Sequence, residues 1–186
     1  MTGASRRQRI QALLFAAIMV VSMVAAGVGG LAGSAAAETT TVSSSDELID
    51  AVGGEDPTAI SGDTVVINES FSLDNDVSVN VENITIEGES GDETVSQVSD
   101  DSTKVFQINS ANVTLRDINL RSEISINAND VSVREVNIST PDSGFGIKAT
   151  GVSGVVIENN TIRNTGVNID ETAQAVYLSD SSGTID

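Results

Sequence analysis

The sequence contains no cysteine and no histidine, and its three methionines all lie within the first 23 residues. Without cysteine the chain has neither disulfide bonds nor thiolate chemistry, so packing must provide its stability. The residues after position 23 also offer no soft or imidazole metal ligand, which excludes copper binding. We therefore expect no cofactor except a hard cation such as Ca²⁺, bound by oxygen atoms.

Basic residues are also scarce, since the chain has nine lysines and arginines against 27 aspartates and glutamates. All 27 acidic residues follow residue 37, where only six basic residues remain, so this part carries a net charge of −21. Concentrated cations screen such a charge, which predicts a protein adapted to high salt. An ordinary acidic secreted protein is the alternative. Nucleic acid is excluded as a partner, because phosphate binding requires clustered lysine and arginine.

The first 37 residues, which contain no acidic residue, have the pattern of an export signal. The basic segment Ser5–Ile10 precedes an apolar stretch from Ala12 to about Val28, and three alanines end the segment at Ala37. This pattern predicts a signal peptide over residues 1–37, cleaved after Ala37, and a protein that is extracellular or on the cell surface. An uncleaved N-terminal anchor is the alternative, because the apolar stretch is long enough to span a membrane.

The same segment resembles the signal peptides of haloarchaeal surface glycoproteins, which combine a basic start, a long Ala/Val/Met centre and an Ala-Ala-Ala end. The resemblance covers 37 residues. It implies a surface-layer-associated glycoprotein of a halophilic archaeon. The Arg6-Arg7 pair leaves the choice between the general and the twin-arginine export route open.

Residues 38–62 are predicted to form an N-terminal cap region with one short helix. Ser44 is placed to cap the first turn, and Glu47 completes a capping box. Gly53 ends the helix. The apolar side of this helix consists of Leu48, Ile49 and Val52.

Residues 63–186 contain short β-branched segments that recur as triplets. In the first triplet Ile108 precedes Leu115 by 7 residues, and Leu115 precedes Leu120 by 5. The next triplet, Ile126, Val133 and Ile138, has offsets of 7 and 5 residues. The third triplet, Ala149, Ile157 and Ile162, has offsets of 8 and 5. A final pair, Leu178 and Ile185, is 7 residues apart. A unit repeated at near-constant spacing predicts a solenoid, in which each strand stacks on its equivalent one coil away.

Alternation within these strands predicts which side chains face the core. The inward side chains form an aliphatic column of Val113, Leu115, Val131, Val133, Val155 and Ile157. The outward side chains are Thr114, Arg116, Ser132 and Arg134. A β-sandwich built from the same short strands is the structural alternative.

The repeats NVTLRDINL (112–120), DVSVREVNI (130–138) and GVVIENNTI (154–162) resemble the pectate-lyase-like right-handed β-helix superfamily. The DELIDAV and GDTVVI segments resemble the N-terminal cap of such proteins, and the resemblance covers about residues 40–186. It implies an all-β fold, a right-handed parallel β-helix with a short N-terminal capping helix. It leaves the function open, because lyases, hydrolases, adhesins and structural proteins share this architecture.

The sequence stops at Asp186, where the second strand of a further coil is expected. We therefore expect an incomplete solenoid that belongs to a longer protein. Membrane contact is expected only through the signal segment or through an anchor beyond residue 186.

Stacking is expected to place Arg116 over Arg134 and Asp117 over Glu135 at about 5 Å, the spacing of neighbouring strands. These four residues are the catalytic candidates, because close carboxylates can shift each other's pKa and a nearby arginine can act as the base of a lyase. Asp117 and Glu135 are also the candidate Ca²⁺ ligands. One coil further on Asn159 replaces the carboxylate, so a solvated polar ladder is the alternative.

The corner after the third strand of each triplet lengthens along the chain, from 6 residues to 11 and then to 16. Insertions that recur at one corner stack beside one sheet and favour binding there. The candidate binding loops are Ser139–Gly146 and Arg163–Ala173, together with the outward residues of neighbouring strands. Tolerated surface loops are the alternative.

Five Asn-X-Ser/Thr sequons are candidate glycosylation sites in an exported chain. We expect two of them, Asn137 and Asn159, to lie in tight corners with poor access. The five asparagines are Asn68, Asn83, Asn112, Asn137 and Asn159.

These patterns together predict an exported cell-surface glycoprotein whose solenoid has a structural or adhesive role. Polysaccharides or other surface glycoproteins are the expected partners. The alternative is a polysaccharide lyase or glycoside hydrolase of the β-helix kind, which would require an acid, an arginine and a Ca²⁺ site clustered beside the long corners.

Overall fold

The structure, a computed structural model, describes residues 36–54, 56–97, 105–140, 145–164 and 174–186. The predicted signal peptide therefore lies outside the described residues except for Ala36 and Ala37. In the ranges that are described, no helix is long and apolar enough to cross a membrane.

One helix and 17 strands form in the described part of the chain. Helix α2 spans Ser45–Val52. The strands are β1 (Thr39–Val42), β2 (Thr64–Ile67), β3 (Phe71–Leu73), β4 (Val77–Val79), β5 (Thr85–Gly88), β6 (Thr94–Gln97), β7 (Val105–Ile108), β8 (Thr114–Arg116), β9 (Asn119–Arg121), β10 (Glu123–Ile126), β11 (Ser132–Arg134), β12 (Asn137–Thr140), β13 (Phe145–Thr150), β14 (Val155–Glu158), β15 (Thr161–Asn164), β16 (Gln174–Ser179) and β17 (Gly183–Ile185).

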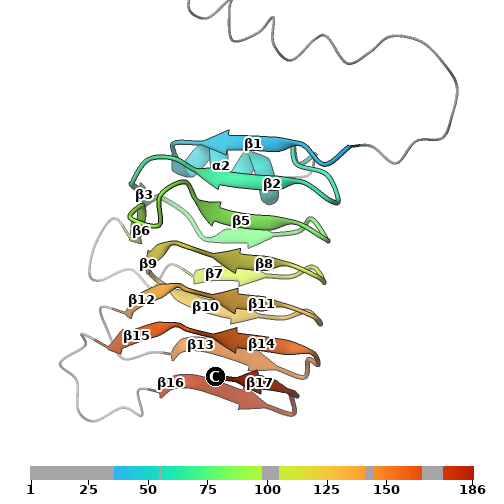
Figure 1. Cartoon of the computed structure of the whole chain (residues 1–186), viewed down its shortest axis with the longest axis vertical. Coiled ribbons are helices and arrows are strands. Elements are labelled where there is room, and N and C mark those ends of the chain that lie inside the picture. Colours follow the sequence, from blue (N-terminus) through green and yellow to red (C-terminus); the bar gives the residue numbers. More distant parts are fainter. Residues whose placement is uncertain (1–35, 55, 98–104, 141–144, 165–173) are drawn as a thin grey trace, which may run out of the picture. The chain divides into compact units, whose positions relative to one another are not determined.

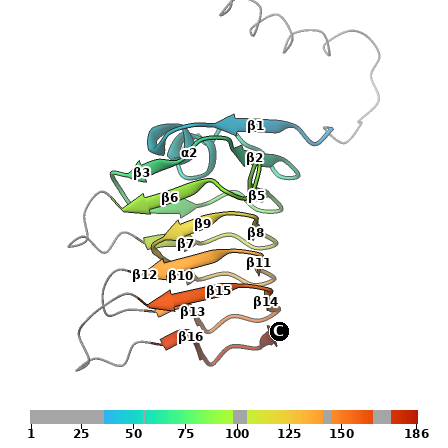
Figure 2. The same cartoon turned by 60° about the vertical axis from the view of Figure 1, so that its left-hand side comes forward.

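The strands form three parallel sheets that the chain visits in turn (Figure 1). Sheet 1 has the order β1-β2-β5-β8-β11-β14-β17, sheet 2 the order β3-β6-β9-β12-β15, and sheet 3 the order β4-β7-β10-β13-β16. Each strand lies beside its equivalent from the next coil, and Figure 2 shows this stacking for β6, β9, β12 and β15. The fold is a right-handed parallel β-helix, as predicted, and the β-sandwich alternative is wrong.

The register of the sheets confirms the triplet spacing residue by residue. Leu115 pairs with Val133, which pairs in turn with Ile157. The first members of the triplets form one column of partners in sheet 3, which consists of Ile108, Ile126, Ala149 and Leu178. The third members form another column in sheet 2, which consists of Leu120, Ile138 and Ile162. The constant spacing thus reflects the need for one aliphatic side chain at the same inward position of every coil.

The core is built almost entirely from these aliphatic columns. The six inward residues predicted for sheet 1 are all at most 3% exposed, whereas the outward Arg116 and Arg134 are exposed. Burial of each such aliphatic side chain contributes about 1.5–3 kcal/mol. Phe106 is the largest fully buried side chain among the described residues. A flat stack of coils accommodates β-branched side chains well, which accounts for the scarcity of aromatic residues.

Helix α2 begins and ends where the sequence predicts. The Ser44 hydroxyl accepts a hydrogen bond from the Glu47 N–H at 3.3 Å, and the Gly53 N–H donates to the Ile49 carbonyl at 2.8 Å. The Glu47 carboxylate reaches one residue further than a standard capping box, because it accepts from the N–H and the hydroxyl of Ser43 at 2.7 and 2.9 Å. Leu48 and Val52 are buried, and Ile49 is half-buried.

Strand β1 was not predicted, and the first two coils lie within the predicted solenoid but before the first triplet that the spacing revealed. Strand β1 lies within the predicted cap region, yet it pairs in parallel with β2 and forms one edge of sheet 1. The corner between β5 and β6 is longer than the equivalent corner of the later coils: Ile86, the partner of Leu115, precedes Val95, the partner of Leu120, by 9 residues instead of 5. Thr85 follows its partner Thr64 by 21 residues, and Thr114 follows its partner Thr85 by 29.

Candidate functional site

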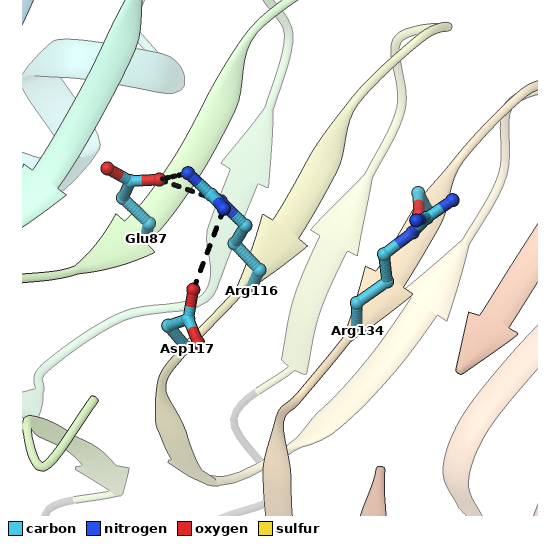
Figure 3. A network of polar contacts seen from close by, with 5 residues as sticks. Glu87, Arg116, Asp117 and Arg134 are labelled. Atoms are coloured by element: carbon cyan, nitrogen blue, oxygen red, sulfur yellow. Dashed lines mark hydrogen bonds and ion pairs between the residues drawn. The ribbon is translucent and has the colours of Figure 1, made fainter. Parts of the chain in front are cut away.

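The two stacked arginines form part of a charged column on the outer face of sheet 1. Glu87, Arg116, Arg134 and Glu158 occupy equivalent positions on four successive strands. The Arg116 Nε donates to Glu87 Oε2 at 2.8 Å, and Figure 3 shows the Arg116 guanidinium pointing toward Glu87 and Asp117. At the other end of the column, Arg134 Nη1 lies 3.2 Å from Glu158 Oε2. The predicted stacking of Arg116 on Arg134 is therefore confirmed.

The two arginines of this column are paired with carboxylates and open to solvent. Each guanidinium is paired with a carboxylate on the side away from the other arginine, so the two like charges are separately neutralised. Arg134 also donates from Nε to the Ser132 hydroxyl at 2.6 Å. Both arginine side chains are 47% exposed, and exposed ion pairs contribute only about 0.2–1 kcal/mol each. A solvated polar ladder, the alternative stated for these positions, describes the geometry.

Asp117 and Glu135 lie at the corner where the chain passes from sheet 1 to sheet 2. Their φ angles are 53° and 55°, and Asn159 has a φ of 55° at the same corner one coil later. All three residues therefore adopt the left-handed backbone conformation that turns the chain. The carbonyl of Asp117 accepts from the Gly88 N–H at 3.2 Å, and the Glu135 N–H donates to the Glu158 carbonyl at 3.1 Å. These contacts give both residues a backbone role that the sequence interpretation missed.

The carboxylates of Asp117 and Glu135 are not part of a larger acidic cluster in the described residues. Within the described ranges, no group of three or more acidic residues is placed to hold an ion. Asp117 lies near a cation of the protein itself, since its Oδ2 is 3.8 Å from Arg116 Nη1. In the part of the chain that the structure describes, the candidate Ca²⁺ ligands Asp117 and Glu135 are thus not joined by a third acidic side chain, and Ca²⁺ binding at this corner stays a prediction.

A groove of about 510 Å³ crosses the outer face of sheet 2. Two columns of outward side chains line it. They belong to β6, β9, β12 and β15, which follow one another in sheet 2 (Figure 2). One column is Thr94, Asn119, Asn137 and Thr161, and the other contains Arg121, Ser139 and Arg163. Side chains that are far apart in the sequence therefore meet because the coils stack.

The groove is locally basic in a highly acidic protein. None of its nine described lining residues is Asp or Glu, while Arg121 and Arg163 are two of the six basic residues that follow residue 37. Arg163 is exposed and makes no ion pair within the described ranges. Two asparagine side chains of the groove hold each other in place, since Asn137 Nδ2 donates to Asn119 Oδ1 at 2.8 Å. This combination of cationic and neutral polar groups is suited to an anionic ligand rich in hydroxyl groups.

The groove lies beside the corner where the binding loops were predicted. Most of those loops, residues 141–144 and 165–173, lie outside the described residues. Ser139 and Arg163, at the start of the two predicted loops, do line the groove. Arg121 was missed, although a signal was available: it follows Leu120 directly, as Ser139 follows Ile138 and Arg163 follows Ile162.

A second feature that the sequence did not reveal is a cluster of two aromatic rings and a lysine on sheet 3. The ring centroids of Phe145 and Tyr177 are 4.9 Å apart, and Lys148 Nζ lies 5.3 Å from the centre of the Phe145 ring. The three side chains come from the neighbouring strands β13 and β16 and are half-buried. They form an amphipathic surface on sheet 3, whereas the groove lies on sheet 2.

The five sequons differ in how far they present the asparagine side chain. Asn68 is half-buried, and its Oδ1 is buried without a hydrogen-bond partner. The other four are exposed, including Asn137 on strand β12 and Asn159 at a corner, so the expectation of poor access at these two positions is wrong. Asn83 donates from Nδ2 to the Ser61 hydroxyl at 2.9 Å. Glycosylation at all five positions stays a prediction.

No family model, curated protein or solved structure matches the chain. The fold defines the class of protein, which is a right-handed parallel β-helix.

Proposed function

We propose that this protein is an exported cell-surface β-helix glycoprotein that binds anionic polysaccharide in the groove of sheet 2, without catalysing a reaction. The observation that carries the proposal is the groove itself, which brings Arg121 and Arg163 together with asparagine and threonine side chains and no described carboxylate. Outside the groove, the surface of this protein, which has a net charge of −18, repels polyanions.

The residue types suit this ligand class. A guanidinium group binds a carboxylate or sulfate group through two parallel hydrogen bonds. Arg163 pairs with Ser139, and Arg121 lies one strand beyond Ser139, so the two arginines are separated by two strand spacings, about 10 Å. A polymer with a regular series of acidic groups is able to contact both. The hydroxyl groups of its sugars match the asparagine and threonine column.

The described residues support binding better than hydrolysis. A glycoside hydrolase needs two carboxyl groups on either side of the scissile bond, and the described lining of the groove provides none. The arginines that were candidates for a lyase base, Arg116 and Arg134, lie on sheet 1 and are paired with glutamates. Among the described lining residues, no carboxylate opposes an anionic ligand beside Arg163.

The proposed location and glycosylation are supported by the sequence. The charged, apolar and small-residue parts of residues 1–37 favour export. The net charge of −21 after residue 37 favours a high-salt environment. Three of the five sequons present exposed asparagines outside the groove, at Asn83, Asn112 and Asn159.

The binding proposal is tested by titrating the purified protein with oligogalacturonate and with a neutral oligosaccharide of the same length. We expect binding of the anionic sugar only, weakened at least tenfold by Arg163→Gln. Arg116→Gln is the matched control, because it removes an exposed arginine outside the groove and should leave binding unchanged. Equal binding of both sugars, or no binding, contradicts the proposal. The appearance of unsaturated sugar products would instead identify a lyase.

A further inference from the structure

Asp63 is a buried carboxylate without a cationic partner in the described part of the chain. It is 4% exposed and directly precedes strand β2. Both of its oxygens accept hydrogen bonds from the backbone: Oδ2 from the Ile60 N–H at 2.9 Å and Oδ1 from the Glu38 N–H at 2.8 Å. A carboxylate in such a place is costly to desolvate unless a positive charge compensates it.

The donor to Oδ1 is the residue that directly follows the predicted cleavage site. Glu38 is held in place by β-sheet contacts of its own, since its carbonyl accepts from the Thr64 N–H at 2.9 Å. The next residue, Thr39, is the register partner of Thr64. The nitrogen of residue 38 is therefore positioned against Asp63 by sheet 1, and not by the residues that precede it.

We propose that Asp63 is the binding site for the N-terminal ammonium group of the mature protein. This inference rests on the export included in the proposed function and on the cleavage after Ala37 that the sequence predicts. Hydrolysis of the Ala37–Glu38 peptide bond adds the hydroxyl of water to the Ala37 carbonyl carbon and a proton to the Glu38 nitrogen, which takes up one more proton from solvent. The nitrogen that donates one neutral hydrogen bond to Asp63 then becomes a cation with three donors.

The ion pair would anchor an exposed edge of the fold. Strand β1 is one of the two edge strands of sheet 1, and on one side it has no neighbouring strand among the described residues. Edge strands are the positions where a sheet frays or pairs with another chain. A charge-assisted bond at the first residue of the mature chain opposes fraying where the strand has the fewest contacts. Removal of the signal segment would thereby stabilise the folded protein.

The experiment uses the full chain with a specific protease site placed immediately before Glu38, so that the folded protein can be cut in solution to leave Glu38 as the first residue. Unfolding by denaturant is measured before and after the cut. We expect the folding equilibrium constant to rise roughly tenfold on cleavage and this rise to disappear in Asp63→Asn. In the matched control the protease site lies one residue earlier, which leaves Ala37 in front of Glu38, and no rise is expected.

An equal rise in the control or in Asp63→Asn, or no rise in the parent chain, overturns the proposed ion pair. If Asp63→Asn does not fold, the rate of acylation of the N-terminal amine decides. It should be at least tenfold lower for the chain that begins at Glu38 than for the one that begins at Ala37, and equal rates overturn the proposal. N-terminal sequencing of the chain exported by a haloarchaeal host tests the cleavage separately. A first residue other than Glu38 overturns the processing step, whatever the unfolding experiments give.

Discussion

At the scale of single residues, the backbone of the corners decides which amino acids occupy them. The corners between sheet 3 and sheet 1 have a positive φ at Asn83, Asn112, Asp130 and Gly154, and Gly62 has one at the equivalent position before β2. Glycine, asparagine and aspartate are the residues that adopt this conformation most readily. Two of these positions begin sequons, because a corner asparagine is followed by an inward aliphatic residue and an outward threonine. The high number of sequons therefore reflects in part the geometry of the coil.

Glu135 is the residue least suited to its corner, because a glutamate gains nothing from the left-handed conformation. We expect Glu135→Gly to raise the free energy of unfolding by about 1 kcal/mol, since glycine adopts a φ of 55° without steric cost. Denaturant unfolding measures the difference. The control is Asn159→Gly at the same corner one coil later, for which we expect a smaller gain. A loss of stability in Glu135→Gly would show that its side chain makes a contribution larger than the backbone strain.

Glu93 should give the stability of the protein a specific dependence on pH. The hydrogen bond from the Ser90 hydroxyl, at 2.6 Å, is the main cause that lowers the pKa of Glu93, and the N–H groups of Ser90 and Gly91 act in the same direction, while burial opposes them. A pKa that is lowered in the folded state stabilises the protein above the unfolded value of about 4.5, and this contribution is lost as the pH falls through the folded value.

The test is the difference between the parent protein and Glu93→Gln as a function of pH. At neutral pH we expect the substitution to lower the free energy of unfolding by about 1–2 kcal/mol, because hydrogen bonds to a charged group are lost. The difference should shrink as the pH falls below 4.5. Chemical unfolding at a series of pH values measures it, and a difference that does not change with pH would assign Glu93 a purely steric role.

At the scale of elements, each face of the solenoid has its own chemistry. Sheet 1 carries the paired Glu87, Arg116, Arg134 and Glu158, sheet 2 carries the basic groove, and sheet 3 carries the aromatic rings beside Lys148. Because consecutive strands of a coil belong to different sheets, outward residues that are close in sequence lie on different faces of the solenoid. Residues one coil apart are brought together instead.

The column on sheet 1 should be structural and sensitive to salt. We expect Arg116→Gln to lower the free energy of unfolding by about 0.5–1 kcal/mol in dilute buffer, because Glu87 loses its partner. In molar salt the effect should fall to near zero, since salt screens exposed pairs. Thr114→Ala, on the same strand and face, is the control for an uncharged change. An effect of Arg116→Gln that is independent of salt would contradict the ion-pair interpretation.

At the scale of the whole molecule, charge and fold act in opposite directions. The aliphatic columns stabilise the coils, whereas a net charge of −18 makes the folded chain repel itself. The few cations of the described chain are distributed over three faces and do not offset this excess. We therefore expect the stability of the folded protein to depend on the salt concentration of the solvent.

We expect the melting temperature to rise steadily as sodium chloride is increased from 0.1 M to 2 M, because counterions screen the repulsion between carboxylates. Differential scanning calorimetry measures this. The same series in a non-ionic osmolyte is the control, which separates charge screening from the general effect of excluded solutes. A melting temperature that is independent of salt would contradict the prediction of a salt-adapted protein and favour an ordinary acidic secreted protein.

The sequence by itself determined the fold, the register of the later coils and the inward residues. Leu115, Val133 and Ile157 could be aligned without a structure, because a stack of coils needs an aliphatic side chain at each inward position and two-residue alternation makes this need visible. The capping helix could be predicted for a similar reason, since its signals are local.

Only the tertiary structure decided which outward residues meet. Arg121 and Arg163 join one groove, and Glu38 reaches Asp63 across 25 residues of sequence. It also decided that Asp117 and Glu135 turn a corner through the left-handed backbone conformation. The physical reason is that outward positions carry no hydrophobic requirement, so no periodic pattern marks them. Their partners depend on corner lengths and backbone angles, which are settled only when the coils stack.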